Sequence, residues 1–362
     1  MKLRRVIFNF HLYLGLTAGL ILVLSGLTGS MVVFREEIET LAFPQLMDTT
    51  VRDAQVPFQA VLDTVQDTYP EDRIFSVRMP RTPRQTYQVR MNNTHDLLVY
   101  ADPYSGKILG AHREKDTVIG WIALLHHDLL IGEAGKNILG ASALLLVFIS
   151  ITGFVLWWPP NGKGKITQGL KVNWRAPWRR VVFDMHRAMG IYSLFFLLII
   201  AVTGASLVYN KAAAELANFL TASPPRPVPP ASTYSDTGKT LFPIDELLQQ
   251  AERIIPDAAI TWVNFPQTSQ APFVIRKKLP EESHPNGRNF IYFDQYTGKV
   301  LRVEDTAAAS SGTRIYNVLY PTHTGAIGGT YTRVLQFFIG LMPLILFATG
   351  FVMWRNRRKA KR

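Results

Sequence analysis

Four stretches of the sequence contain no charged residue, and each is long enough to cross a lipid bilayer. They cover residues 12–34, 138–158, 188–210 and 334–354. A helix needs about 20 apolar residues to span the hydrocarbon core, so the pattern predicts four membrane-spanning helices. The first stretch lacks a small-residue cleavage site followed by a polar start, and we therefore interpret it as an uncleaved anchor.

Positive charge is concentrated in three short segments beside these stretches. The three segments contain no acidic residue. Short cytoplasmic segments of membrane proteins are rich in Lys and Arg, so both termini and the central loop are predicted to be cytoplasmic. The formal charge of +12 then reports topology, and we expect no nucleic-acid partner. The basic residues are Lys2, Arg4, Arg5, Lys163, Lys165, Lys171, Arg175, Arg179, Arg180, Arg355, Arg357, Arg358, Lys359, Lys361 and Arg362.

The two long segments between these flanks, 35–120 and 211–320, are predicted to lie outside as small α+β domains. The first has a helical pattern at 58–69 and strand-like runs at 73–79, 85–91, 97–101 and 107–109. The second has a helix at 244–255 and runs at 260–265, 272–277, 289–293 and 299–303. The remaining segments are 1–34 (first span), 121–158 (outer-face segment and second span), 159–180 (cytoplasmic loop), 181–210 (third span), 321–354 (outer-face segment and fourth span) and 355–362 (cytoplasmic tail).

An internal repeat relates the two halves of the chain. The residues around His11 align without a gap with those around His186, and those around His126 align with those around His323. A Thr-Gly pair follows 17 residues after His11 and His186, and 26 residues after His126 and His323. The predicted fold class is an α-helical membrane protein. It is a four-helix bundle of two repeats, each with an inserted α+β domain, around a pseudo-twofold axis along the membrane normal.

The four repeat-related histidines are the candidate functional residues, because an ionisable residue beside a membrane span is costly. His11 and His186 begin their spans on the cytoplasmic side, whereas His126 and His323 are placed on short segments at the outer face. This gives one facing pair per membrane face. Two imidazoles with a flat apolar slot between them suit the axial ligands of a b-type haem.

Other residues extend this haem hypothesis or limit it. Lys136, Arg187 and Arg333 are candidates to pair with haem propionates. The chain has no cysteine, which excludes covalent c-type haem and iron–sulfur clusters. A divalent metal site would need further ligands, and the spans contain no Asp or Glu.

The remaining histidines and the Thr-Gly pairs receive more ordinary interpretations. His127 follows His126 directly, so only one of the two can face the bundle axis; the repeat selects His126, and His127 stays as the alternative. His95, His112 and His284 have no repeat partner and are expected at the surface. The Thr-Gly pairs are expected to be packing notches, with hydroxyl bonds to backbone or to a haem edge as the alternative.

Several motifs, in their order and spacing, resemble those of the PepSY-associated transmembrane proteins, a bacterial inner-membrane family that includes ferric-siderophore reductases of the FoxB/PiuB type. The resemblance covers essentially the whole chain. The motifs are Phe10-His11-Leu-Tyr-Leu-Gly15, Leu125-His126-His-Asp-Leu-Leu-Ile-Gly132-Glu-Ala-Gly135-Lys136, His186-Arg187-Ala-Met-Gly190, His323-Thr-Gly325 and two Tyr-x-Gly-Lys turns, at 104–107 and 296–299.

This resemblance implies a function as well as a fold. It implies two PepSY-like periplasmic domains and two b haems held by His11, His126, His186 and His323. It also implies a haem-dependent oxidoreductase of the inner membrane that passes electrons from the cytoplasmic side to a ferric siderophore or another iron chelate. Because the chain has no flavin or nicotinamide fingerprint, the first donor is expected to be another protein or a quinol.

Two other functions stay open at this point. One is a non-enzymatic membrane regulator or sensor whose PepSY-like modules bind a peptide or a protease. The other is a transporter in which the histidines relay protons. The visible spectrum of the purified protein separates both from a haem protein.

Overall fold

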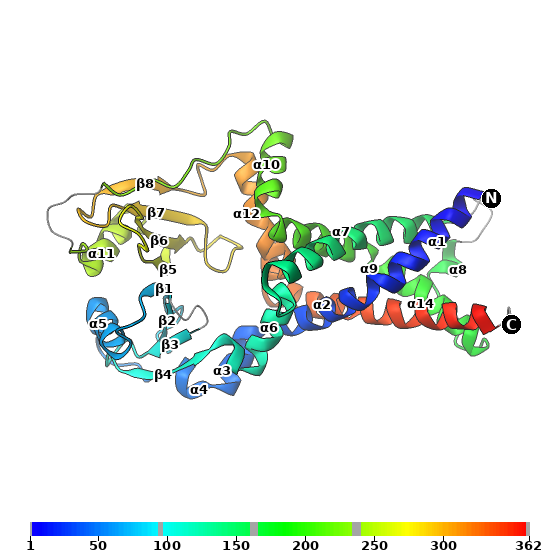
Figure 1. The fold of residues 1–362 in the computed structure, drawn as a ribbon, viewed down its shortest axis with the longest axis horizontal. Coiled ribbons are helices and arrows are strands. Elements are labelled where there is room, and N and C mark those ends of the chain that lie inside the picture. The colour runs from blue at the N-terminus through cyan, green and yellow to red at the C-terminus, as the bar shows by residue number, and fades with distance from the viewer. Residues whose placement is uncertain (1, 93–96, 160–165, 234–239, 360–362) are drawn as a thin grey trace. The chain divides into compact units, whose positions relative to one another are not determined.

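The computed structural model describes residues 2–92, 97–159, 166–233 and 240–359. These residues form two compact units (Figure 1). Met1–Phe34, Ile122–Ala213 and Leu319–Arg362 make up a helical unit, and Arg35–Trp121 with Ala214–Val318 make up a sheet unit. Four of the basic residues used for the topology prediction, Lys163, Lys165, Lys361 and Arg362, lie outside the described residues.

The helical unit contains the predicted spans. Three helical stretches, Gly132–Trp157, Trp178–Val208 and Ala326–Arg358, are long and apolar enough to cross a membrane, and a bent pair of helices forms a fourth candidate. The chain is therefore a multi-pass membrane protein. The helices of this unit and its connections are α1 (Lys2–Thr17), α2 (Gly19–Val32), α6 (Val118–Asp128), α7 (Gly132–Trp157), α8 (Ile166–Gly169), α9 (Trp178–Val208), α12 (Ser311–His323), α13 (Gly329–Gly340) and α14 (Met342–Lys359).

The first span differs from the prediction of one continuous helix. Helices α1 and α2 meet at Ala18 at an angle of 55°. The hydroxyl of Thr17 donates to the carbonyl of Tyr13, four residues earlier, at 2.9 Å. The break lies between Gly15 and Gly19, and glycines inside a helix weaken it.

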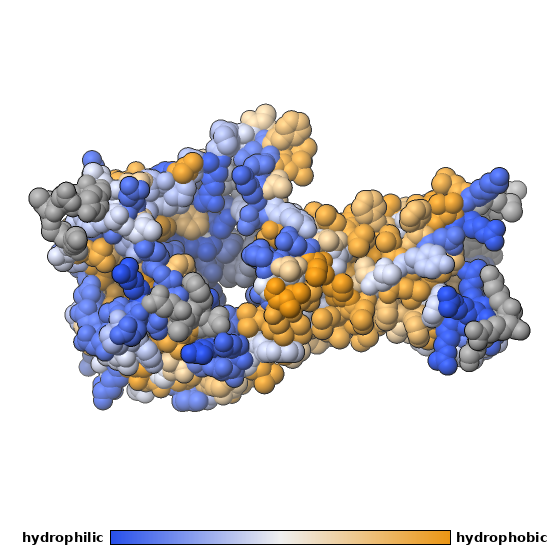
Figure 2. Space-filling view, in the orientation of Figure 1, coloured by the Kyte–Doolittle hydropathy of each residue, from blue (hydrophilic) through white to orange (hydrophobic). Residues whose placement is uncertain are grey.

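Small residues bring the helices of this unit close together, as expected in a membrane. A Cβ added at Gly26 of α2 would lie 2.3 Å from the carbonyl oxygen of Gly340 in α13. One turn further along α2, the hydroxyl of Ser30 donates to the carbonyl of Phe337 at 2.8 Å. Large apolar side chains instead cover the outside, where Phe148 and Phe195 are 61% and 66% exposed. Figure 2 shows this apolar surface over the membrane helices.

The sheet unit is built on one antiparallel sheet of eight strands in the order β4-β3-β2-β1-β5-β6-β7-β8. Each predicted α+β segment contributes four strands close to the predicted runs, and β1 pairs with β5 to join the two segments. The sequence analysis does not anticipate this pairing. The strands are β1 (Ile74–Arg78), β2 (Tyr87–Met91), β3 (Leu97–Ala101), β4 (Ile108–Arg113), β5 (Ala259–Asn264), β6 (Phe273–Lys278), β7 (Asn289–Phe293) and β8 (Val300–Glu304).

The main hydrophobic core lies on one face of this sheet, and a smaller cluster forms around Met47, Leu98 and Tyr100. Alternation of side chains places one fully buried residue of each central strand in register with its neighbours. This row runs through Val99, Val89, Val77, Val263, Ile275 and Ile291.

Two amphipathic helices, α5 (Phe58–Thr68) and α11 (Ile244–Ile254), pack against this core. The carboxylate of Asp245 in α11 accepts from the backbone N–H groups of Phe58 and Gln59, and so caps the start of α5. The unit also contains α3 (Arg35–Ala42), α4 (Pro44–Met47) and α10 (Asn210–Leu220), of which α10 is shared with the helical unit.

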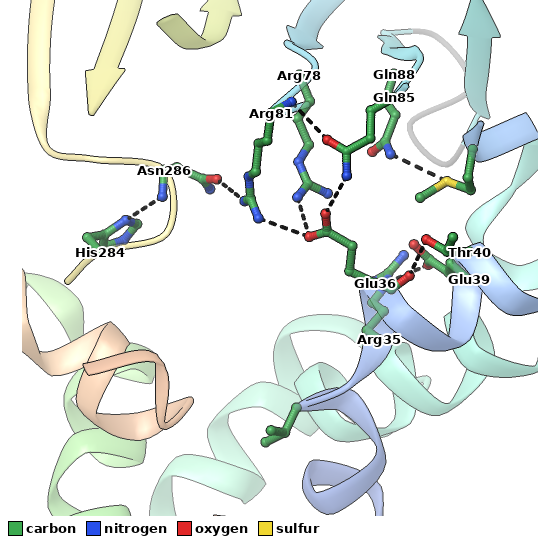
Figure 3. Close-up of polar contacts among 12 residues, drawn as sticks. Arg35, Glu36, Glu39, Thr40, Arg78, Arg81, Gln85, Gln88, His284 and Asn286 are labelled. Carbon is green, nitrogen blue, oxygen red and sulfur yellow. Dashed lines mark hydrogen bonds and ion pairs between the residues drawn. The ribbon is translucent and has the colours of Figure 1, made fainter. Parts of the chain in front are cut away.

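A polar network on the sheet unit links its two segments (Figure 3). Glu36 of α3 pairs with Arg78 of β1 at 2.5 Å and with Arg81 at 3.0 Å, and Arg81 donates to Asn286 of the second segment at 2.7 Å. Burial alone raises the pKa of the Glu36 carboxyl, but Arg78 and Arg81 outweigh burial and hold this pKa below its usual range. The network therefore stabilises the joined sheet with an ionised carboxylate.

Candidate functional site

The structure brings the four repeat-related histidines together as two pairs. His11 of α1 faces His186 of α9, with ring centres 6.3 Å apart and ring planes at 87°. His126, in the last turn of α6, faces His323, the last residue of α12, with ring centres 6.4 Å apart and planes at 32°. Each pair combines one residue from each half of the sequence.

These separations match two imidazoles on opposite sides of one metal ion. A metal–imidazole bond is about 2.0–2.1 Å long, and the centre of a five-membered ring lies about 1.1–1.2 Å behind the bonded nitrogen, given bonds of about 1.35 Å. Two rings bound to a common ion in line therefore have centres about 6.2–6.6 Å apart. Both observed separations, 6.3 and 6.4 Å, fall within this interval.

Each ring is held by the threonine of one Thr-Gly pair. The Nδ1 atom of His11 lies 3.1 Å from Oγ1 of Thr152 in α7, and that of His186 lies 2.9 Å from Oγ1 of Thr349 in α14. The second pair repeats the arrangement, because Nδ1 of His126 lies 3.2 Å from Oγ1 of Thr28 and Nδ1 of His323 lies 3.1 Å from Oγ1 of Thr203.

For His11 and His126, a backbone carbonyl three residues before the threonine makes a second hydrogen bond to the same Nδ1 atom. The carbonyl of Ile149 lies 3.1 Å from Nδ1 of His11, and the carbonyl of Ser25 lies 3.0 Å from Nδ1 of His126. Leu346 and Ile200 provide the equivalent backbone bonds to His186 and His323. A carbonyl oxygen can only accept, so this network assigns the ring proton to Nδ1 and leaves the lone pair on Nε2.

The glycine of each Thr-Gly pair makes room for the ring. A Cβ added at Gly29, Gly204, Gly153 or Gly350 would lie 2.8, 3.0, 3.1 or 3.4 Å from Cε1 of the histidine in that notch. The carbonyl that accepts from Nδ1 is also the one four residues before this glycine, and the missing side chain exposes it. We call each Thr-Gly pair with this carbonyl a histidine socket.

The sequence analysis missed the socket role of these threonines. It interprets the Thr-Gly pairs as packing notches between helices, whereas the structure shows that each notch receives an imidazole. The signal was available in the sequence. All four spans carry the pair, and its spacing from the histidine is the same in both members of each repeat.

Open space lies beside the first pair. Gly15 and Gly190 follow His11 and His186 by four residues, and residues four apart share one face of a helix. A Cβ added at Gly15 would meet no atom within 4 Å, and one at Gly190 would meet only the side chain of Leu346, at 3.7 Å. Gly19, one turn further along, instead packs closely against Phe347. No side chain therefore fills the space beside Gly15, one turn along α1 from His11.

The three predicted propionate partners lie in protein contacts of the helical unit. The Nζ atom of Lys136 pairs with Glu133 at 2.7 Å. The guanidinium of Arg187 lies 3.5 Å from the carbonyl of Trp157, and that of Arg333 donates to the carbonyl of Val33 at 2.6 Å. A role of Lys136, Arg187 and Arg333 toward cofactor carboxylates stays a prediction.

The described histidines other than these four belong to neither pair. The ring of His127 is 5.7 Å from that of His126, but it is His126 that faces His323. His112 is half-buried, and its Nε2 lies 3.1 Å from the hydroxyl of Tyr100. His95 lies outside the described residues.

The prediction that His284 lies at the surface is wrong, because this residue is only 8% exposed. Nη2 of Arg276 lies 3.1 Å from Nδ1 of this ring. The N–H of Asn286 donates to the same Nδ1 (Figure 3). Burial, with the nearby charges of Arg276 and Arg288, lowers the pKa of His284 to about 3. The ring is therefore neutral at physiological pH.

No group of three or more His, Asp or Glu side chains suited to a metal ion occurs within residues 2–92, 97–159, 166–233 and 240–359. Each histidine pair therefore offers two protein ligands to a metal. A metal with four ligands of its own, as in a porphyrin, fits such a pair better than a bare ion does.

A comparison with protein families identifies the chain. The family model described as the PepSY-associated TM region matches residues 8–357. The chain belongs to this family. All four paired histidines and all four sockets of this PepSY-associated TM protein lie within the matched region. A comparison with curated proteins finds no match.

Proposed function

We propose that this PepSY-associated TM protein is a di-haem b electron-transfer protein that reduces ferric iron chelates. The observation that carries the proposal is the pair of 6.3 and 6.4 Å separations between histidine rings. Within the described residues, the hydrogen bonds found for these rings involve Nδ1 and leave Nε2 for a metal. A second acceptor at Nδ1 raises the basicity of a metal-binding imidazole.

Haem b suits these sites for physical reasons. The porphyrin supplies four in-plane nitrogens, so two imidazoles complete the coordination. When bound, each haem would carry one electron at a time. The chain's own contribution is to hold Nε2 of each histidine toward its partner and to keep the ring proton on Nδ1.

The two pairs lie near opposite ends of helix α9, which supports a path across the membrane. His186 and Thr203, whose hydroxyl holds His323, are 17 residues apart in this helix. At 1.5 Å per residue this is about 25 Å along the axis, compared with about 30 Å for the hydrocarbon core. One pair is then near each membrane face.

We further propose that the chain lies in a bacterial inner membrane with both termini in the cytoplasm and is built from two repeats. The start of α1, the end of α14 and α8 lie at the same end of the helical unit (Figure 1). The described residues of the segments rich in Lys and Arg, such as Arg4, Arg5, Arg355 and Arg357, belong to these helix ends, which supports a cytoplasmic location. His11 and His186 then make the inner site and His126 and His323 the outer site. The matched sockets of the two halves support the repeat.

A basic and aromatic cluster on the sheet unit supports an anionic, oxygen-rich chelate as substrate. The guanidinium groups of Arg226, Arg276 and Arg288 lie 5.7, 5.3 and 5.8 Å from the ring centre of Phe290. Burial, and after it the charges of Arg276 and Arg288, lower the pKa of His284, and Arg226 also pairs with Glu304 at 2.8 Å. Guanidinium groups bind carboxylates with two parallel hydrogen bonds. The ferric ion of such a chelate gains one electron and becomes ferrous, and oxygen donors hold the ferrous ion less tightly.

The test uses the full chain, purified in detergent from cells supplied with haem. Dithionite should shift the Soret band and produce sharp α and β bands, and anaerobic ferric citrate should then restore the oxidised spectrum. Gallium citrate is the matched control, because it has the same charge type but accepts no electron. A colourless protein would contradict the haem assignment. Reduced haem bands that persist with ferric citrate and with a ferric hydroxamate chelate would contradict the reductase assignment.

A further inference from the structure

The two histidine pairs share one spacing but differ in the angle between their rings. The ring planes of His11 and His186 are nearly perpendicular, at 87°, whereas those of His126 and His323 are at 32°. The difference occurs although the same Thr-Gly socket holds all four rings. This inference rests on the proposed function, because it concerns how the rings would act on a bound haem.

The sockets restrict rotation of the rings. The Nδ1–H groups of His11 and His126 point at two fixed acceptors, the threonine Oγ1 and a carbonyl one turn away on the same helix. Those of His186 and His323 point at the threonine Oγ1 of their sockets. The edge of each ring at Cε1 lies against the socket glycine, where an added Cβ would be only 2.8–3.4 Å away. The hydrogen bonds at Nδ1 and the contact of Cε1 with the glycine together fix the plane of the imidazole. The orientation of the ring is therefore set by the helix that carries the socket.

The threonine hydroxyls themselves are fixed. Each threonine Oγ1 lies 2.7 or 2.8 Å from the carbonyl oxygen four residues earlier in its own helix. These pairs are Thr28 with Leu24, Thr152 with Phe148, Thr203 with Ile199 and Thr349 with Ile345. A hydroxyl has one proton. Because this proton is donated to the carbonyl four residues earlier, the oxygen is left to accept from Nδ1–H.

The angle between two axial imidazoles has an electronic consequence. The π system of each ring overlaps with the iron d orbital that lies perpendicular to the ring plane. Nearly parallel rings act on the same d orbital and split the pair of dπ orbitals, whereas perpendicular rings act on one each and leave them close in energy. Axial ligands and their hydrogen-bonding partners are the means by which a protein tunes a haem.

We propose that the four sockets are positioning elements that make the two haem sites electronically unequal, with crossed imidazoles at the inner site and nearly parallel imidazoles at the outer site. Thr152 and Thr349 position the rings of the inner site, and Thr28 and Thr203 position those of the outer site. The threonines act through the histidines and do not themselves contact the reacting atoms.

Low-temperature electron paramagnetic resonance of the oxidised, haem-loaded full chain tests this assignment. We expect two low-spin ferric signals in equal amount. One is a single feature at a large g value, typical of crossed rings, and the other is a three-line rhombic signal. The His186→Ala variant should lose the first and His323→Ala the second. Two rhombic signals, or the reverse assignment, would overturn the inference while the haem assignment stands; a protein without haem would overturn both.

Threonine variants test the positioning role at one site at a time. In Thr349→Val the large-g signal should shift and the reduction potential of the inner site should rise, because Nδ1–H loses an acceptor and the imidazole becomes a weaker base. The outer site should not change. Thr203→Val should show the converse, and Thr349→Ser and Thr203→Ser should restore the original signal and potential. If the valine variants retain haem with unchanged signals and potentials, the sockets do not position the rings.

Discussion

The glycines of the four histidine sockets provide a graded test of how the rings are held. A Cβ added at Gly29 would lie 2.8 Å from Cε1 of the bound histidine, compared with 3.0 Å at Gly204, 3.1 Å at Gly153 and 3.4 Å at Gly350. Carbon atoms pack best at about 3.5–4.0 Å. Substitution by alanine should therefore displace the ring strongly at Gly29 and hardly at all at Gly350.

The expected magnitudes follow from these contacts. Overpacking of a tight site costs about 1–3 kcal/mol, and in Gly29→Ala the ring cannot move aside without losing its bonds to Thr28 and Ser25. Since 1.4 kcal/mol is tenfold in an equilibrium constant, Gly29→Ala should weaken haem binding at the outer site by about tenfold or more. Gly350→Ala should change the affinity of the inner site by less than about threefold.

The assay is the rate at which apomyoglobin in excess removes haem from each purified variant, followed in the Soret band. Loss should be fast for half of the haem in Gly29→Ala and close to wild type in Gly350→Ala, the matched control. Gly204→Ala and Gly153→Ala should fall between them. Equal rates for Gly29→Ala and Gly350→Ala would refute the idea that the sockets hold the rings by close contact.

Three further predictions concern single side chains. His126→Ala should lose the outer haem while His127→Ala keeps it, as measured by haem content; the opposite result would show that His127, and not His126, is the haem ligand. The pKa of His284 is lowered to about 3 in the folded chain from about 6.5 unfolded, so the unfolded state binds more protons between these values. The stability of the sheet should therefore fall as pH decreases below about 6.5, by at most about 1.4 kcal/mol per pH unit. Hydrogen exchange of β6 and β7 should report this loss, and a His284→Gln variant with the same pH slope would contradict it. The pKa of Glu36 is lowered by folding. Its carboxylate therefore stabilises the folded sheet above the pKa it has in the unfolded chain, and this stabilisation is lost as the pH falls through its pKa in the folded chain. Glu36→Gln should speed exchange of β1 at pH 7, by an amount equivalent to about 1–3 kcal/mol, and unchanged exchange would show that the pairing with Arg78 adds nothing.

The spans and strands could be predicted because their signals are local. Charge-free stretches predict α7, α9 and the span formed by α13 and α14, and alternating apolar residues predict all eight strands within a few positions. The bend at Ala18 escaped prediction because the first stretch is apolar and free of charge throughout, so its sequence pattern is that of one continuous helix. The pairing of β1 with β5 also escaped, because hydrogen bonds between edge strands involve backbone groups that every sequence has.

The histidine pairs could be predicted because duplication placed equivalent residues in both halves of the chain. The repeat led to His11 with His186 and to His126 with His323, and the structure brings each pair together. The matched spacing of the Thr-Gly pairs from the histidines is visible in the sequence, but the socket role was not predicted from it, because small residues also form packing notches in membrane helices. The burial of His284 depends on the guanidinium of Arg276, eight residues earlier, and no local pattern indicates it.

The amount of haem per chain is the most direct test of the central claim. The pyridine haemochrome assay should give two b haems per wild-type chain and one per chain in each of the variants His11→Ala, His126→Ala, His186→Ala and His323→Ala. Variants of one pair should lose the same spectral component. A wild-type chain without haem, or histidine variants that all retain two, would contradict the claim.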